Sequence, residues 1–141
     1  MIVNRRRYLA TIGGLAAAGT AGCLDRLRVS ASLETTDSGV DVEEPPAVTL
    51  DDGAVTARGT VLYGSSDCGT VRLAHANYER SQDRLDLLVV AADDSRTFLS
   101  CHDDLVEAGY RLQATVRGRL RRVVVTEHHA FGAAYSTTVR E

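Results

Sequence analysis

The chain contains no lysine and no tryptophan, and its 141 residues include only two prolines, three cysteines and one methionine. Because lysine is absent, all 16 basic residues are arginine, which is typical of a GC-rich genome or of a protein that works in high salt. The sequence also has no C-x-x-C or H-x-x-x-H pair for zinc, no glycine-rich phosphate loop and no nucleophile elbow. It therefore offers no catalytic motif, and we expect a protein that is not an enzyme and uses no cofactor.

Acidic residues outnumber arginines and are unevenly placed along the chain. Residues 1–22 contain three arginines and no acid, so residues 23–141 keep 13 arginines against 19 acids, a net charge of −6. Residues 30–57 contain seven acids and no base, and we expect segment 35–46, which holds both prolines, to be a solvated loop rather than a docking site. The only basic cluster, at 117–122, has no interleaved aromatic residues, which argues against nucleic acid as a partner.

The first 23 residues have the three-part layout of an export signal. Arginines at positions 5 to 7 are followed by an apolar run of 14 residues from Tyr8 to Ala21, and then by Gly22 and Cys23. Crossing a bilayer as a helix takes about 20 residues, so this run is short for a permanent transmembrane span. We therefore expect residues 1–22 to be a signal peptide.

Two short motifs in this leader resemble those of a known protein class. The order Asn-Arg-Arg-Arg-Tyr-Leu at positions 4 to 9 resembles a twin-arginine export signal, carried here by Arg5, Arg6, Tyr8 and Leu9. The small residues before Cys23 resemble a lipobox, whose cysteine accepts lipid and becomes the first residue of the mature chain. Together the motifs resemble exported lipoproteins of halophilic archaea.

This resemblance implies where the protein is and what holds it there. The twin-arginine translocation machinery would export the chain, and membrane lipid joined to Cys23 would hold it on the extracytoplasmic face of the cell membrane. Residues 23–26 would form the anchor and a short tether. A cleaved leader with a soluble product, or an uncleaved anchor, are the alternatives.

With Cys23 used for lipid, Cys68 and Cys101 remain as an even pair in an oxidising compartment, and we expect them to form a disulfide. Closing a loop of about 34 residues would stabilise the fold by roughly 3–4 kcal/mol on the chain-entropy model. The alternative, in which His102 activates Cys101 as a thiol nucleophile, is disfavoured because adjacent residues of an extended chain point in opposite directions.

After Cys23 the hydrophobic pattern has period two almost throughout, which indicates half-buried strands. The stretch 85–91 is nearly all apolar, so we expect the strand 84–92 to be a central strand covered on both faces. A short helical turn is expected at 102–108, and the arginines at 117–122 are expected at a hairpin tip. The strand-like segments, from which we expect seven to eight strands, are 27–34, 47–50, 54–63, 70–78, 84–92, 97–101, 110–116, 121–128 and, as an additional edge segment, 135–139.

Seven to eight short strands in residues 27–141 predict a single all-β domain, a small two-sheet β-sandwich with an immunoglobulin-like outline. A small β-barrel is the second choice. No tryptophan is present to pack on a disulfide, so the likeness to immunoglobulin domains concerns the architecture alone.

The predicted role is that of a binding or interaction module for an envelope protein or a glycan. Three aromatic residues in or near expected loops are candidate partner contacts, although packing at strand ends would also explain them: Tyr63, Phe131 and Tyr135. One alternative is a small hydrolase or metal-dependent enzyme that uses His75, His102, His128 or His129, of which the last two should face opposite ways on one strand. Another is an inhibitor or chaperone of exported proteins that inserts the loop near Cys68 into its partner.

Overall fold

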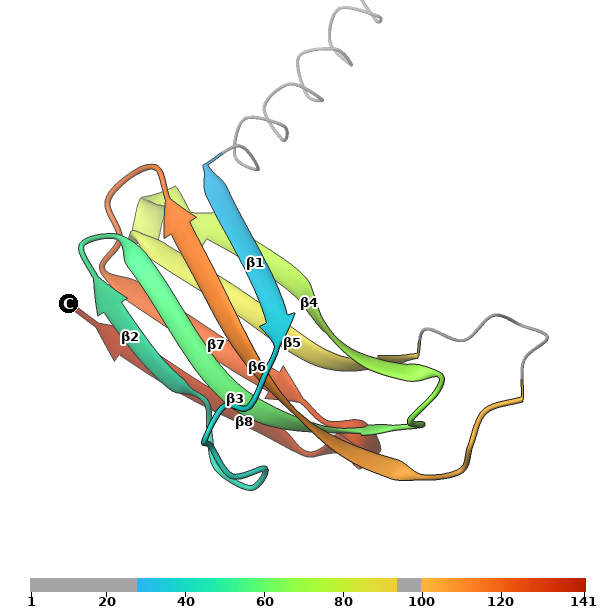
Figure 1. Ribbon diagram of the computed structural model, residues 1–141. Helices are drawn as coiled ribbons and strands as arrows, with labels where there is room; N and C mark the ends of the chain where they lie inside the picture. The colour runs from blue at the N-terminus through green and yellow to red at the C-terminus, as the bar shows by residue number, and fades with distance from the viewer. Residues whose placement is uncertain (1–27, 94–99) are drawn as a thin grey trace, which may run out of the picture.

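The computed structural model describes residues 28–93 and 100–141, which form two four-stranded sheets packed face to face (Figure 1). Sheet A contains, in spatial order, β1 (Val29–Thr35), β6 (Leu105–Val116), β3 (Ala54–Gly64) and β2 (Ala47–Asp51). Sheet B contains β4 (Gly69–Glu79), β5 (Arg84–Asp93), β7 (Arg122–His128) and β8 (Ala134–Arg140). The two-sheet all-β prediction is confirmed, and the described strands do not close into the alternative barrel. The expected leader and the expected lipidation site, Cys23, lie outside the described residues.

Two single-turn 3-10 helices complete the described secondary structure, η1 (Arg80–Gln82) before β5 and η2 (Ala130–Gly132) between β7 and β8. All neighbouring strands are antiparallel except β5 and β7, which are parallel. Within residues 28–93 and 100–141, no helix is long and apolar enough to cross a bilayer.

The core lies between the sheets and follows the period-two pattern, because alternate side chains of each strand point inward. Burial of each large apolar side chain stabilises the fold by about 1.5–3 kcal/mol. The fully buried apolar side chains of highest volume are Tyr110, Leu85, Leu87, Leu112, Val55, Val61, Val89, Val123 and Val125.

Strand β6 begins earlier than expected. Residues 105–108 are not helical but pair with the end of β3, with Leu105 opposite Gly64 and Ala108 opposite Val61. The prediction of a helical turn at 102–108 is therefore wrong, since these backbone groups form a ladder with β3 instead of a local turn. The expected strand at 97–101 lies partly outside the described residues, and Ser100 and Cys101 are not in a strand.

Two other expectations, for strand β5 and for the arginine-rich segment, are wrong. Strand β5 is central, between β4 and β7, but its outward residues are only partly buried because none of the described elements covers that face of sheet B. The arginine-rich segment 117–121 is not a hairpin tip, because β6 lies in sheet A and β7 in sheet B. It crosses between the sheets and buries Leu120 on the way.

The sandwich has two distinct ends. The entry end contains the beginning of β1 at Val29, the crossing segment 117–121 and the β2–β3 turn, and it is uppermost in Figure 1. The far end contains the loops that follow β1, β3 and β7 and the segment that leads into β6. The part of the chain that precedes the described residues therefore joins the domain at the entry end.

Candidate functional site

A groove of about 640 Å³ opens at the far end, between the acidic loop 36–46 and strands β3 and β6. Three carboxylates lie along it, those of Asp37 and Asp41 in the loop and of Glu107 on β6. The remaining lining is largely small or apolar: Thr35, Thr36, Val40, Val42, Thr60, Tyr63, Val106, Ala108 and Gly109. The groove thus combines negative charge with an apolar surface.

Hydrogen bonds hold the acidic loop in place and give the groove a fixed wall. The Thr60 hydroxyl donates to the Val40 carbonyl (2.7 Å) and lies 2.8 Å from Oγ of Ser38, which is only 3% exposed. The amide of Thr36 donates to the carbonyl of Gly109 (2.9 Å). A Cβ at Gly109 would overlap the Thr36 carbonyl, so only glycine permits this close approach.

Around the groove, the far end carries strong negative charge. The described loops of this end, together with Asp93 at the end of β5 and Glu107 near the start of β6, contain nine acids and no arginine. The nine are Asp37, Asp41, Glu43, Glu44, Asp67, Asp93, Asp103, Asp104 and Glu107. Asp37 and Asp41 each accept a backbone N–H two residues ahead, from Gly39 (3.2 Å) and Glu43 (2.9 Å), which fixes both side chains.

The expected Cys68–Cys101 disulfide is present, with the two Cα atoms 5.7 Å apart. It joins the β3–β4 loop to the segment before β6, and Asp67 strengthens the junction. The carboxylate of Asp67 accepts the His102 backbone N–H (2.9 Å) and lies 2.8 Å from Nδ1 of the same histidine. The side-chain hydrogen bond with Asp67 raises the pKa of His102, and the pKa of Asp67 is lowered first by a hydrogen bond from the Ser65 hydroxyl and then by those with His102.

This junction also contains a serine, but the order of its hydrogen bonds does not suit nucleophilic catalysis. The Ser65 hydroxyl donates to Asp67, and Asp67 lies between it and His102. Activation of a serine requires the imidazole next to the hydroxyl, with the carboxylate behind the imidazole. The arrangement therefore holds two loops together rather than preparing a nucleophile.

A buried polar cluster lies between the sheets near the far end. Glu127 is 0% exposed and accepts a hydrogen bond from the Tyr110 hydroxyl (2.6 Å), while its other oxygen lies 3.2 Å from Nε2 of His129. The amide of Leu62 donates to Nδ1 of His129 (3.1 Å), so in the neutral ring the proton is on Nε2 and points to Glu127. The carboxylate thus has a donor for each oxygen.

Burial raises the pKa of Glu127, and its hydrogen bonds with Tyr110 and His129 act in the opposite direction. Burial also raises the pKa of Tyr110, which keeps its hydroxyl protonated as a donor. The cluster exists because Gly59 of β3 leaves room for it: a Cβ there would overlap Oε1 of Glu127 and lie 2.8 Å from the Tyr110 hydroxyl.

The three aromatic residues expected to contact a partner, Tyr63, Phe131 and Tyr135, differ in their exposure to solvent. Tyr63 is half buried and packs against the core, and Tyr135 is half buried with its ring edge-on to that of His129, at 5.1 Å. Phe131 alone is an open side chain, 87% exposed, and its backbone has φ +66°, a conformation that costs a non-glycine residue about 1–2 kcal/mol. It lies in the β7–β8 loop at the far end.

The four histidines have separate surroundings. His129 is buried on Glu127, His102 is bound to Asp67, and His75 and His128 are exposed on β4 and at the end of β7. His128 and His129 face opposite ways, as expected. Among residues 28–93 and 100–141, no group of three or more His, Cys, Asp or Glu is arranged to hold a metal ion.

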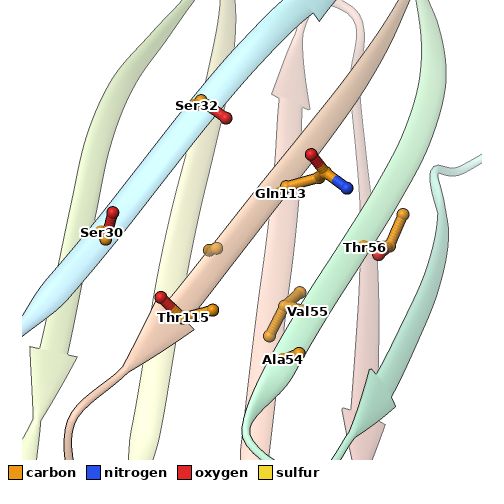
Figure 2. Close-up of a pocket in the computed structure, with 8 residues that line it drawn as sticks. Ser30, Ser32, Ala54, Val55, Thr56, Gln113 and Thr115 are labelled. Atoms are coloured by element: carbon orange, nitrogen blue, oxygen red, sulfur yellow. The ribbon is translucent and has the colours of Figure 1, made fainter.

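A second hollow, of about 290 Å³, lies on the outer face of sheet A (Figure 2). It is shallow, and its lining consists of neutral residues of three neighbouring strands. Ser32 and Thr56 flank Gln113 in one row, because both pair with it across the sheet. These side chains can form hydrogen bonds with a neutral polar ligand but supply no charge.

Comparisons with known proteins assign the chain to no group: no family model, no curated protein and no solved structure matches it. The candidate site therefore stands on its geometry. Sequence reasoning treated Asp37 and Asp41 as parts of a solvated loop and did not single out Glu107. It also missed Glu127, although this residue has the same inward parity as Val123 and Val125, which is the signal of a buried carboxylate.

Proposed function

We propose that the chain is an exported lipoprotein, anchored to the outer face of the membrane through Cys23, whose β-sandwich binds a positively charged segment of an envelope protein. The binding surface is the far end, made of the acidic groove and the exposed ring of Phe131. The observation that carries this proposal is the groove itself, an acidic hollow with an apolar surface at the end opposite the entry of the leader.

The chemistry of the groove suits a cationic, partly apolar segment. Asp37, Asp41 and Glu107 supply carboxylates that pair with arginine or lysine, and the valines of the groove supply apolar contact. Because Ser38 and Thr60 fix the loop, binding requires little ordering of the groove, which favours affinity. Phe131 adds an aromatic side chain of the kind that anchors partners at interfaces.

The first test measures binding of a short peptide of alternating arginine and leucine by fluorescence polarisation. In Asp37→Asn/Asp41→Asn/Glu107→Gln the three charges are removed while the amide oxygens keep the turn hydrogen bonds. We expect affinity to fall at least tenfold in low salt. A peptide that binds this variant as tightly as the original chain would refute the groove as the site.

The matched control removes three charges at the entry end, in Asp51→Asn/Asp52→Asn/Glu79→Gln. Both variants raise the net charge by the same amount, so a general electrostatic attraction would weaken equally in the two. We expect the control to keep most of the affinity. Equal loss in both would show that the peptide responds to net charge and not to the groove.

The anchor is tested separately, in cells that express the chain. We expect the mature protein to begin at a lipid-modified Cys23 by mass spectrometry, and Cys23→Ser to leave the membrane fraction. An intact Met1 end, or a Cys23→Ser variant that is processed and retained as before, would contradict the anchoring part of the proposal. The binding result at the groove does not depend on this outcome.

A glycan is the alternative ligand, and the neutral row of Ser32, Gln113 and Thr56 favours it. Hydroxyl and amide side chains match the hydroxyl groups of a neutral sugar. The variants Phe131→Ala and Gln113→Ala separate the two surfaces, since each leaves the other intact. Loss of envelope binding in Gln113→Ala alone would transfer the function to the face of sheet A.

A further inference from the structure

Arginine is concentrated at the entry end of the sandwich. Arg117, Arg119 and Arg121 lie on the crossing segment between the sheets, and all three are exposed. Five other arginines lie at the same end: Arg28, Arg80, Arg84, Arg122 and Arg140. The backbone N–H of Arg117 donates to the Arg28 carbonyl (2.8 Å), so the crossing segment lies directly beside the point where β1 begins.

Acidic residues at the entry end neutralise this charge only in part. Six are present: Asp51, Asp52, Glu79, Asp83, Asp86 and Glu141. Arg84 forms an ion pair with Asp86 (2.8 Å), and Arg119 reaches Asp83 at 3.9 Å. Arg117 and Arg121 form no ion pair with any described residue and remain available to an external anion.

The domain is therefore polarised along its strands. The entry end has eight arginines against six acids, whereas the far end has nine acids against one described arginine, Arg72, which is level with the end of β7. A negatively charged surface attracts the first end and repels the second. Near a membrane, each basic residue close to anionic headgroups strengthens binding about fivefold.

The length of the tether limits where the arginines can be. Five residues lie between Cys23 and Val29, and a fully extended chain spans at most about 3.3–3.6 Å per residue, so the six steps from Cys23 to Val29 reach about 20 Å in total. If Cys23 carries lipid, the beginning of β1 and the adjacent Arg117 are held within this distance of the headgroups. The arginine-rich end is thus the part of the sandwich nearest to the membrane.

We propose that the entry end, through Arg117, Arg119 and Arg121, docks on the anionic phosphate headgroups of the membrane and holds the sandwich upright with its acidic groove facing outward. This inference rests on the proposed anchoring at Cys23 and adds the surface and the lipid chemistry that set the orientation. The planar guanidinium group suits phosphate because it can donate two parallel hydrogen bonds.

The shape of the domain makes the orientation measurable. Strand β3 has 11 residues, so at about 3.3 Å per residue the sandwich is roughly 36 Å long. Two sheets about 10 Å apart, with their outer side chains, make it only about 20–25 Å thick. An upright domain therefore forms a protein layer roughly 10–15 Å thicker than one lying on a sheet face.

The test couples the full chain through the thiol of Cys23 to a maleimide lipid in a supported bilayer, and neutron reflectometry measures the layer. Because Cys68 and Cys101 form a disulfide, Cys23 is the one free thiol. On bilayers containing about one-third phosphatidylglycerol at 0.15 M salt, we expect the thick, upright layer. On pure phosphatidylcholine we expect a thinner layer, since no headgroup charge selects an end.

Charge reversal identifies the surface. Arg117→Glu/Arg119→Glu/Arg121→Glu is expected to reduce the layer on the anionic bilayer to the thickness seen on phosphatidylcholine. Replacement of the same three arginines by glutamine is a milder second variant in case the reversal perturbs folding, and a smaller reduction in thickness is expected. Retention of the native disulfide and circular dichroism spectrum checks both.

The matched control reverses three exposed arginines away from the entry end, Arg58, Arg72 and Arg111. It changes the net charge by the same amount and should keep the upright layer. Equal thinning in the control and in the entry-end variant would overturn the inference, as would a layer of one thickness on both lipids. Since the anchor is made chemically, this result is independent of whether cells lipidate Cys23.

Discussion

The substitution Gly59→Ala should lower the free energy of unfolding strongly, because it adds a methyl group to a closely packed part of the core. Gly59 faces the buried cluster of Glu127, Tyr110 and His129, and its backbone is not in the left-handed region reserved for glycine. Alanine at such a position would ordinarily add a few tenths of a kcal/mol of stability by restricting the unfolded chain. Here the new Cβ would occupy the place of the Glu127 carboxylate and crowd the Tyr110 ring.

The cost has two parts. Overpacking a close-packed core costs about 1–3 kcal/mol. Displacement of the carboxylate also loses or bends its hydrogen bonds with Tyr110 and His129, and a hydrogen bond to a charged group contributes about 1.5–3 kcal/mol. We therefore expect Gly59→Ala to lower the free energy of unfolding by about 3–5 kcal/mol, a large part of the roughly 5–15 kcal/mol of a typical domain.

Urea denaturation at fixed salt, followed by tyrosine fluorescence, measures the change. In the Glu127→Ala background the space is empty, so Gly59→Ala should cost about 2 kcal/mol less than in the original chain. Gly132→Ala is the control without a clash, because a Cβ there meets no atom within 4 Å and only the positive φ opposes it. A Gly59→Ala chain within 0.5 kcal/mol of the original, or additive effects of the two substitutions, would refute the packing argument.

Two further predictions concern the junction at the far end. Asp67→Asn should return the pKa of His102 toward 6.5, as measured by NMR titration, whereas Asp103→Asn should leave most of the shift. Because Asp67 raises that pKa and its own pKa is lowered, their contact stabilises the fold fully between pH 3.8 and pH 6.5. The contribution is lost as pH rises through the raised pKa of His102, and it declines below pH 3.8 because the unfolded chain takes up a proton that Asp67 in the fold does not yet accept. Replacing Cys68 and Cys101, 33 positions apart, by serine should lower the free energy of unfolding by about 3–4 kcal/mol in urea denaturation; no loss would contradict a stabilising disulfide.

Local patterning predicts most of the strands because burial in a two-sheet fold repeats every second residue. The turn formers Asp51, Asp52 and Gly53 separate the expected strands 47–50 and 54–63, and the structure pairs Leu50 with Val55 across this turn. In β4 the pattern changes phase: Leu73 and Ala76 both face inward, because a bulge inserts an unpaired Ala74 between them. That phase change is visible in the sequence and marks the bulge.

The sequence could not predict how the strands are shared between the sheets. The alternation in β6 and β7 is the same whether the two strands form a hairpin or lie in opposite sheets, because period two specifies a buried face and not a neighbour. The buried Leu120 within the arginine-rich segment favours a crossing, since a solvated hairpin tip has no reason to bury a leucine. Leu105 illustrates the same limit. It belongs to strand β6 because it pairs with Gly64 of β3, and the local sequence pattern does not show that pairing.

The same limit applies to the candidate site, and it explains why the groove and the buried cluster escaped sequence reasoning while the disulfide did not. Cysteines pair with each other, so two of them in an oxidising compartment predict their own contact. Glu107 becomes a groove residue only because β6 lies beside the acidic loop, and Glu127 is tolerated only because Gly59, 68 positions earlier, leaves room for it. Leu62 then fixes the ring of His129, two residues before Phe131. We infer that the buried cluster of Glu127, Tyr110 and His129 positions the β7–β8 loop. The exposed ring of Phe131 therefore depends on Glu127, a carboxylate that occupies a core position in the alternation of strand β7.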